Sequence, residues 1–348
     1  MEQAGRPRLS PRLIAGLDAA RALSAIYVVA HHVANARGWV QGPGLLLRFG
    51  QEAVLVFFLL SGFVIFANER VRALRPGGYL LRRLRRIYPA LVVAMIVSTL
   101  VAIDNRTLTT DFHWRELIGT LLSLQDVSLL KPGVIVDPYL GNAPLWSLSY
   151  EMAFYLAFPL VLRLWRSRPA LADHAIGLAC CLAYASYVAF PNHWSLVGAY
   201  FLVWWCGAMA ADAYFRGGTD VRSMATPFAW LLVLTAVAAG ATWLVGYRGL
   251  GLYPFLPFRH FFVAAALLAI LFGAIGRRLA SLCARWARPA AYAASISYGL
   301  YVLHYPLLVV WRLASSPAGM ALALTLLVLA AMLADRQLNR WLPRAPAT

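Results

Sequence analysis

The stretch AVLVFFLLSGFVIF, residues 53–66, carries no charge and is apolar throughout except at Ser61 and Gly62. With its flanks it forms a run over 50–68, close to the roughly twenty residues that a helix needs to cross a bilayer. Glycine within such a helix lets a neighbouring helix approach closely. The segment therefore predicts a membrane-spanning helix that packs inside a helical bundle.

Nine other segments repeat this pattern along the 348 residues. The chain is 61% hydrophobic and 13% charged, whereas soluble domains are about 45–50% apolar and about 25% charged. We expect an all-α polytopic membrane bundle of about ten transmembrane helices, forming one domain over 1–348 with no appended soluble domain. The expected spans lie at about 14–36, 50–68, 88–104, 145–165, 173–191, 194–215, 225–247, 258–276, 291–313 and 317–335.

The basic residues orient these spans. If the N-terminus lies inside, the inner segments hold 22 of the 31 Lys and Arg residues and the outer segments hold 8, with Arg21 inside the first span. Such an excess on the cytoplasmic side is the positive-inside pattern, so we expect both termini in the cytoplasm. The net charge of +17 then reflects topology, and we expect no nucleic-acid partner. The longest non-spanning stretch, 105–144, falls outside the membrane.

The four cysteines indicate neither a disulfide framework nor a metal centre. No CxxC motif occurs, and no cluster of Cys and His has the spacing of metal ligands. Three of the four lie in apolar runs, as buried cysteines usually do. They are Cys180, Cys181, Cys206 and Cys283.

The first span carries the densest set of ionisable residues. Arg21 and His32 are eleven residues apart, which places them on one helix face, about 16 Å apart along the axis. Asp18 can hold the guanidinium from one turn away, and Asn35 can orient the imidazole. Ionisable groups inside a membrane are costly, so they indicate a functional site. A structural ion pair with interfacial histidines is the alternative.

Glu151 lies in the segment LWSLSYEMAFYLAFPL, residues 145–160, about 9 Å from the outer end of its helix. His32 lies near the outer end of the first span, so the two side chains can share a depth. A carboxylate beside an imidazole can fix its tautomer and stabilise its charged form. The alternative is that another polar group in the bundle satisfies Glu151.

Two further clusters are candidates. Seven arginines crowd residues 70–86 on the inner side, either as topological charge or as a binding site for a phosphate-rich ligand. His304 lies near the middle of its span among Tyr298, Tyr301 and Tyr305. A histidine bonded to a neighbouring tyrosine in the core is the alternative there.

These segments together resemble the acyltransferase 3 family, the membrane O-acyltransferases of bacterial cell-surface carbohydrates. Arg21, ten residues and then His32 match the family's first-helix motif. Leu55 and Met152 mark departures, because many members have an acidic residue at each of these positions; Glu52 lies three residues before Leu55. The matching segments are GLDAARALSAIYVVAHHV (16–33), FFLLSGFVI (57–65), LLRRLRRIYP (80–89), LWSLSYEMAFYLAFP (145–159) and SYGLYVLHYPLL (297–308).

The resemblance implies a cytoplasmic acyl-CoA donor, most often acetyl-CoA, used as a co-substrate with no permanently bound cofactor. It implies a hydroxyl acceptor on a surface carbohydrate or its lipid-linked precursor, at the bacterial inner membrane. Polysaccharide-assembly proteins are further expected partners. The expected site residues are His32 and Glu151 for catalysis, Arg21, Arg82, Arg83 and Arg86 for the donor, and His304, Tyr301 and Trp146 for the acceptor.

Within this expectation His32 is either the general base or the carrier of the acyl group, and the sequence does not separate the two. Acylation of a small natural product by the same chemistry is an alternative. A proton-coupled transporter is another, although no pair of broken helices recurs in two halves of the chain. An inactive scaffold is disfavoured by the intact Arg21, His32 and Glu151.

Overall fold

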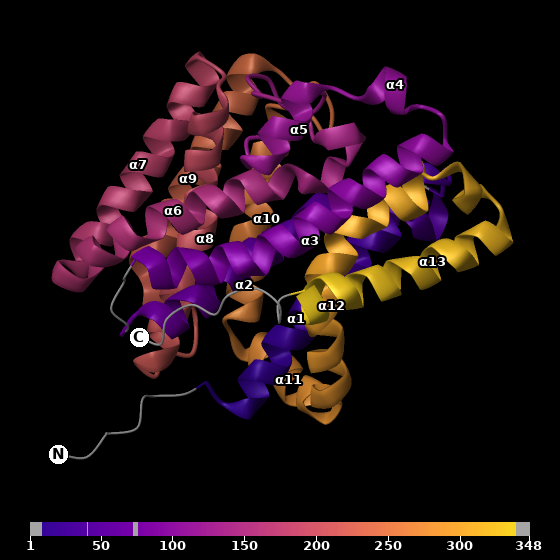
Figure 1. Cartoon of the computed structure of the whole chain (residues 1–348). Helices are drawn as coiled ribbons and strands as arrows, with labels where there is room; N and C mark the ends of the chain where they lie inside the picture. Colours follow the sequence, from indigo (N-terminus) through magenta and orange to yellow (C-terminus); the bar gives the residue numbers. More distant parts are fainter. Residues whose placement is uncertain (1–8, 40, 72–75, 339–348) are drawn as a thin grey trace.

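The computed structural model describes residues 9–39, 41–71 and 76–338, and over these residues the chain is a bundle of helices (Figure 1). Nine helical segments in this part of the chain are long and apolar enough to cross a membrane. The expected all-α polytopic membrane bundle is therefore confirmed. The remaining expected span, 258–276, overlaps helix α10 (Phe255–Leu271), which is apolar but only 17 residues long.

Each of the ten expected spans falls on a helix. Apart from α3, the helix boundaries lie within about five residues of those expected. Helix α12 approaches its expected end because it continues through a π-helical turn at Tyr305–Val310. The ten helices are α1 (Pro11–Ala36), α2 (Gly50–Glu69), α3 (Pro76–Asp104), α6 (Trp146–Ser167), α7 (Pro169–Ala189), α8 (His193–Phe215), α9 (Ala225–Val245), α10 (Phe255–Leu271), α12 (Ala287–His304) and α13 (Pro317–Met332).

Helix α3 begins at Pro76, whereas its span was expected from residue 88. The expected boundary followed the change from charged to apolar residues. Arginine is a good helix former, however, so the arginine-rich segment extends the same helix. Pro89 lies inside α3 without ending it. Arg82, Arg83, Arg85 and Arg86 thus lie on one continuous helix that runs into the bundle.

Helix α2 lies against α8 at a very short separation. A Cβ atom added to Gly62 would meet the Trp204 carbonyl oxygen at 2.0 Å, and one added to Gly207 would meet the Leu59 carbonyl oxygen at 2.1 Å. Only glycine permits this approach of the two backbones. The contact fixes Ser61, the neighbour of Gly62, at the centre of the bundle.

We name the two ends of the bundle by their residues. The basic end holds Arg82, Arg86 and Arg277, and the histidine end holds His32 and His304. Helices α4 (Leu108–Asp111) and α5 (Trp114–Leu121) lie at the opposite end of the bundle from α11 (Ala274–Cys283), as Figure 1 shows.

A buried ion pair anchors the segment that follows α5. The Lys131 ammonium lies 2.6 Å from the Asp126 carboxylate, and the two side chains are only 2% and 0% exposed. The Tyr150 hydroxyl donates a hydrogen bond to Asp126 over 2.6 Å, which ties the segment to α6. Burial lowers the pKa of Lys131, and the Asp126 carboxylate opposes that effect.

Candidate active site

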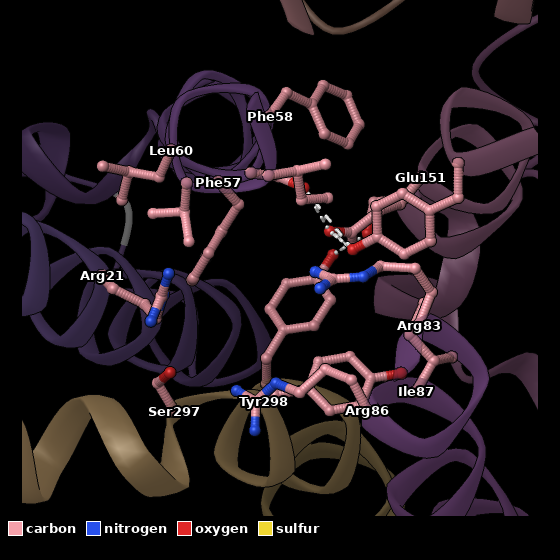
Figure 2. A pocket seen from close by; sticks show the side chains of 16 residues that line it. Arg21, Phe57, Phe58, Leu60, Arg83, Arg86, Ile87, Glu151, Ser297 and Tyr298 are labelled. Carbon is pink, nitrogen blue, oxygen red and sulfur yellow. Dashed lines mark hydrogen bonds between the residues drawn. The ribbon is translucent and has the colours of Figure 1, made fainter. Parts of the chain in front are cut away.

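A cavity of about 230 Å³ lies inside the bundle and is lined by α1, α2, α3, α6 and α12. Figure 2 shows Arg21 facing Arg83 and Glu151 across this cavity, with Arg86 and Tyr298 beside them. Three guanidinium groups and one carboxylate thus share one small space. The arrangement favours an anionic ligand that reaches in from the basic end.

Each arginine of the cavity has an acidic partner at a distance longer than that of a direct hydrogen bond. Arg21 lies 4.0 Å from Asp18, as its sequence spacing predicts, and Arg86 lies 3.5 Å from Asp335 of the last helical turn. Such distances leave the guanidinium groups with donors to spare for a ligand, because an arginine carries five N–H donors. The acidic partners hold the arginines in place without blocking them.

Arg82 and Arg83 are adjacent in sequence but are used differently. One nitrogen of Arg82 donates to both carboxylate oxygens of Glu69, at 2.9 and 2.8 Å, and Arg82 does not line the cavity. Arg83 lies 3.7 Å from Glu69 and does line the cavity. Consecutive residues on a helix point about 100° apart, so only one of the two can face the site.

Glu151 is held by hydroxyl groups on one side. Ser61 and Tyr155 both donate to its Oε1 atom, at 2.9 and 2.5 Å, and the Trp204 indole donates to Ser61 over 3.2 Å. The close contact of α2 with α8 brings Ser61 and Trp204 together. This network fixes the carboxylate at the cavity wall, as the dashed lines in Figure 2 show.

His32 has a histidine as its neighbour. The Nδ1 atom of His32 lies 3.1 Å from Nε2 of His304 and 2.9 Å from the Val28 carbonyl oxygen. His304 is fully buried, whereas His32 is partly exposed. The structure therefore brings together two site residues that the sequence had placed apart.

The expected contact between Glu151 and His32 is not among those of the described residues. Glu151 bonds to Ser61 and Tyr155, and His32 bonds to Val28 and His304. Asn35 was expected to orient His32, but its amide lies 3.1 Å from Nε2 of His31. Neither His32 nor His304 is among the residues that line the cavity.

Tyr301 and Trp146 lie close to the cavity but not equally so. The Tyr301 hydroxyl lines the cavity, donates to the Pro144 carbonyl oxygen over 2.6 Å and lies 2.9 Å from the Ser147 hydroxyl. Trp146 is 6% exposed and packs its ring against the Lys131 ammonium, 4.2 Å from the ring centre. Trp146 thus supports the start of α6 behind Ser147.

Sequence reasoning missed Tyr155, Ser61 and Asp335. Tyr155 is four residues after Glu151, so helical spacing alone could have placed both on one face. Asp335 is an acidic residue in the last expected span, and such a residue is a candidate by default. Ser61 had no such signal, since its contact with Glu151 depends on the packing of α2 against α6.

The chemistry of the site follows from these groups. No group of three or more His, Cys, Asp and Glu side chains in the described part of the chain could hold a metal ion. The cavity arginines can bind phosphates, and the neutral imidazole of His32 has a ring nitrogen that can accept a hydrogen bond. A membrane bundle with an anion-binding cavity next to a histidine is suited to a group transfer from an anionic donor.

Comparison with known proteins identifies that class. A family model described as "Acyltransferase domain" matches residues 14–334. The chain belongs to the acyltransferase 3 family, and it is a multi-pass membrane protein. The resemblance of the five sequence segments is thereby confirmed.

Three relatives share parts of this chain, and two of them are named as acyltransferases. The chain is 35% identical over 196 residues to acyltransferase MdmB of Streptomyces mycarofaciens, which covers 53% of this chain and 49% of that protein. It is 30% identical over 165 residues to O-acetyltransferase OatA of Staphylococcus aureus, which covers 44% of this chain and 25% of that protein. Nodulation protein 10 of Rhizobium leguminosarum is 28% identical over 130 residues, 34% of this chain and 35% of that protein.

The matched region therefore spans about half or less of the length of these relatives. No solved structure matches the chain.

Proposed function

We propose that this protein moves an acetyl group from cytoplasmic acetyl-CoA to a hydroxyl group of a surface carbohydrate or its lipid-linked precursor, at the bacterial inner membrane. The observation that carries the proposal is the cavity that gathers Arg21, Arg83 and Arg86 inside a membrane acyltransferase. CoA carries a pyrophosphate and a 3′-phosphate, which are ligands that arginine binds well. The O-acetyltransferase relative supports an acetyl group and a hydroxyl acceptor.

In this proposal the donor enters from the basic end. Arg83 and Arg86 of α3 bind phosphates, and Arg21 guides the donor deeper into the bundle. Arg21 and His32 lie about 16 Å apart along α1, a span that an extended pantetheine arm can cover. Glu151 accepts a hydrogen bond from an amide N–H of that arm. The arginine excess of the inner segments supports a cytoplasmic location of the basic end.

The size of the cavity limits how much of the donor it can enclose. Pockets that enclose a whole small molecule measure about 300–1,000 Å³, whereas this cavity measures about 230 Å³. The cavity therefore encloses only the part of the donor that lies among Arg21, Arg83 and Arg86, and the thioester end extends beyond it toward His32.

The transfer itself requires a hydroxyl group to attack a thioester carbonyl. An alcohol is a poor nucleophile until a base takes its proton, and a neutral imidazole suits that task. We assign the base to His32, with acyl-His32 as the alternative route. Enclosure in the bundle keeps water away from the thioester.

Acetyl transfer can be tested in membranes of cells that make the protein. [¹⁴C]Acetyl-CoA is added, and radioactivity that mild alkali releases from the membrane fraction is counted as O-acetyl ester. We expect radioactive ester with the parental protein and little with Arg83→Ala/Arg86→Ala at low donor concentration. Arg278, which lies outside the cavity, provides the control, and Arg278→Ala should give the parental amount. Equal counts with and without the protein would refute the donor assignment.

The acceptor requires a separate measurement. Surface glycans and lipid-linked precursors from a deletion strain and its parent are compared by mass spectrometry. We expect one glycan species of the deletion strain to be about 42 mass units lighter than the same species of the parent, which is the mass of one acetyl group. Unchanged glycans together with a lost acetyl ester on a small metabolite would exclude a carbohydrate acceptor.

A further inference from the structure

His304 is hidden from any substrate, yet it touches the candidate base. Its side chain is fully buried, and its ring centre lies 5.1 Å from that of His32 and 6.2 Å from that of Tyr301. The cavity is lined by Tyr301 and not by His304. Any part that His304 plays in the reaction must therefore pass through His32.

The hydrogen bonds of His304 define its tautomer. Its Nδ1 atom lies 3.1 Å from the Leu300 carbonyl oxygen, which can only accept. Nδ1 of His304 must therefore carry the proton. In a neutral imidazole the other nitrogen is then an acceptor, so Nε2 of His304 presents a lone pair.

That lone pair is directed at His32. Nδ1 of His32 lies 3.1 Å from Nε2 of His304 and 2.9 Å from the Val28 carbonyl oxygen. Both neighbours are acceptors, so Nδ1 of His32 must be the donor. The lone pair of neutral His32 is then on Nε2, which makes no hydrogen bond with any described residue.

The geometry points to His304 as a positioning residue that holds His32 in the Nδ1–H tautomer, so that Nε2 of His32 is the atom that takes the acceptor's proton. This inference rests on the proposed function in one respect, namely that His32 acts as the base. Together with the Val28 carbonyl oxygen, His304 selects which nitrogen of His32 is basic, and it fixes the plane of the ring.

The proton balance of the transfer is then complete without a further group. Nε2 of His32 takes the proton as the acceptor oxygen bonds to the thioester carbonyl carbon, and the carbon–sulfur bond breaks to release the CoA thiolate. The same Nε2 returns the proton to that sulfur. While His32 is charged, its Nδ1–H remains bonded to Nε2 of His304, which stabilises the cation.

The tautomer is tested directly by ¹⁵N NMR of the whole protein in lipid nanodiscs with ¹⁵N-labelled histidine. Spectra of His32→Gln identify the His32 signals. We expect the parental His32 to show a protonated Nδ1 and an unprotonated Nε2, and His304→Leu to shift the Nδ1 signal, because Nδ1–H then bonds to the Val28 carbonyl oxygen alone. His174→Leu, on the far helix α7, should leave the His32 signals unchanged. A parental His32 protonated at Nε2 would overturn the inference.

Kinetics test the role apart from the tautomer. We expect His304→Leu to lower kcat by on the order of 10²-fold with little change in the KM for acetyl-CoA. His304→Gln, whose side-chain oxygen can still accept from His32, should recover most of kcat. Equal losses in both variants would overturn the positioning role. If the tautomer is as expected but His32→Ala stays active, the assignment of the base fails while the tautomer stands.

Discussion

One nitrogen of Arg82 lies 2.9 and 2.8 Å from the two carboxylate oxygens of Glu69, a side chain that is fully buried. Arg83, the next residue, faces the cavity instead. The arginine-rich segment of α3 therefore divides into residues that hold the bundle together and residues that line the cavity. This division makes opposite predictions for two neighbouring residues.

Arg82→Ala should reduce stability without changing donor binding. Removing Arg82 takes away the closer of the two arginine partners of the buried Glu69 carboxylate, at a cost of about 1.5–3 kcal/mol for a hydrogen bond to a charged group. We expect a lower thermal unfolding temperature in detergent and a parental KM in the protein that remains folded. Arg82→Ala with Glu69→Gln should regain stability, and a failure of this pair to do so would contradict the structural role.

Arg83→Ala with Arg86→Ala should raise the KM for acetyl-CoA. Each guanidinium that binds a phosphate contributes a charge-assisted hydrogen bond, worth about 1.5–3 kcal/mol. Steady-state kinetics at varied donor concentration measure the change, with abundance followed by immunoblot. If abundance alone falls, the two arginines serve topology and not the donor.

Glu151→Gln should lose most of the transfer activity and leave the fold intact. Glutamine keeps an oxygen that can accept from Ser61 and Tyr155, so the network survives while the charge opposite Arg21 is lost. Single-turnover assays with labelled acetyl-CoA measure the effect. Glu116→Gln in α5, remote from the cavity, is the matched control.

His32→Ala should abolish transfer, whereas His31→Ala should retain more of it. The two side chains point about 100° apart around α1, and His31 bonds to the Leu47 carbonyl oxygen and not to His304. Activity is measured in variants whose membrane abundance equals that of the parent. A well-folded His32→Ala protein that acylates at the parental rate would show that the base lies elsewhere.

The topology predicts both termini in the cytoplasm and 105–144 outside. Reporter fusions at Asp137 and Ala170 should report opposite sides of the membrane, outside and inside respectively, because α6 separates them. Alkaline phosphatase and green fluorescent protein fusions give the two complementary readings. Both sites on one side would contradict the arginine-based orientation.

The helices could be predicted from the sequence because the bilayer sets their length and their composition. The runs around Gly62 and in 317–335 met both requirements, and each became a helix. The start of α3 at Pro76 was missed because charge was taken to end a span. Arginines near a helix end can instead keep their charged groups among acidic partners, as Arg82 does with Glu69.

Within one helix the site was also predictable. The Asp18–Arg21 pair follows from its spacing on α1, and the structure has it at 4.0 Å. Contacts between helices were not predictable in the same way, since depth alone does not say which helices are neighbours. His32 bonds to His304 because α1 packs along α12, while Glu151 on α6 meets Ser61 of α2.

The buried Asp126–Lys131 pair has a practical consequence. Lys131 is the single lysine of the sequence, and its side chain is 2% exposed and bonded to Asp126. Reagents that acylate lysine amines therefore find no accessible lysine on the folded bundle. A lysine label on this protein therefore reports molecules in which the segment that holds Lys131 has separated from α6. Amine labelling then measures local opening and not exposed surface area.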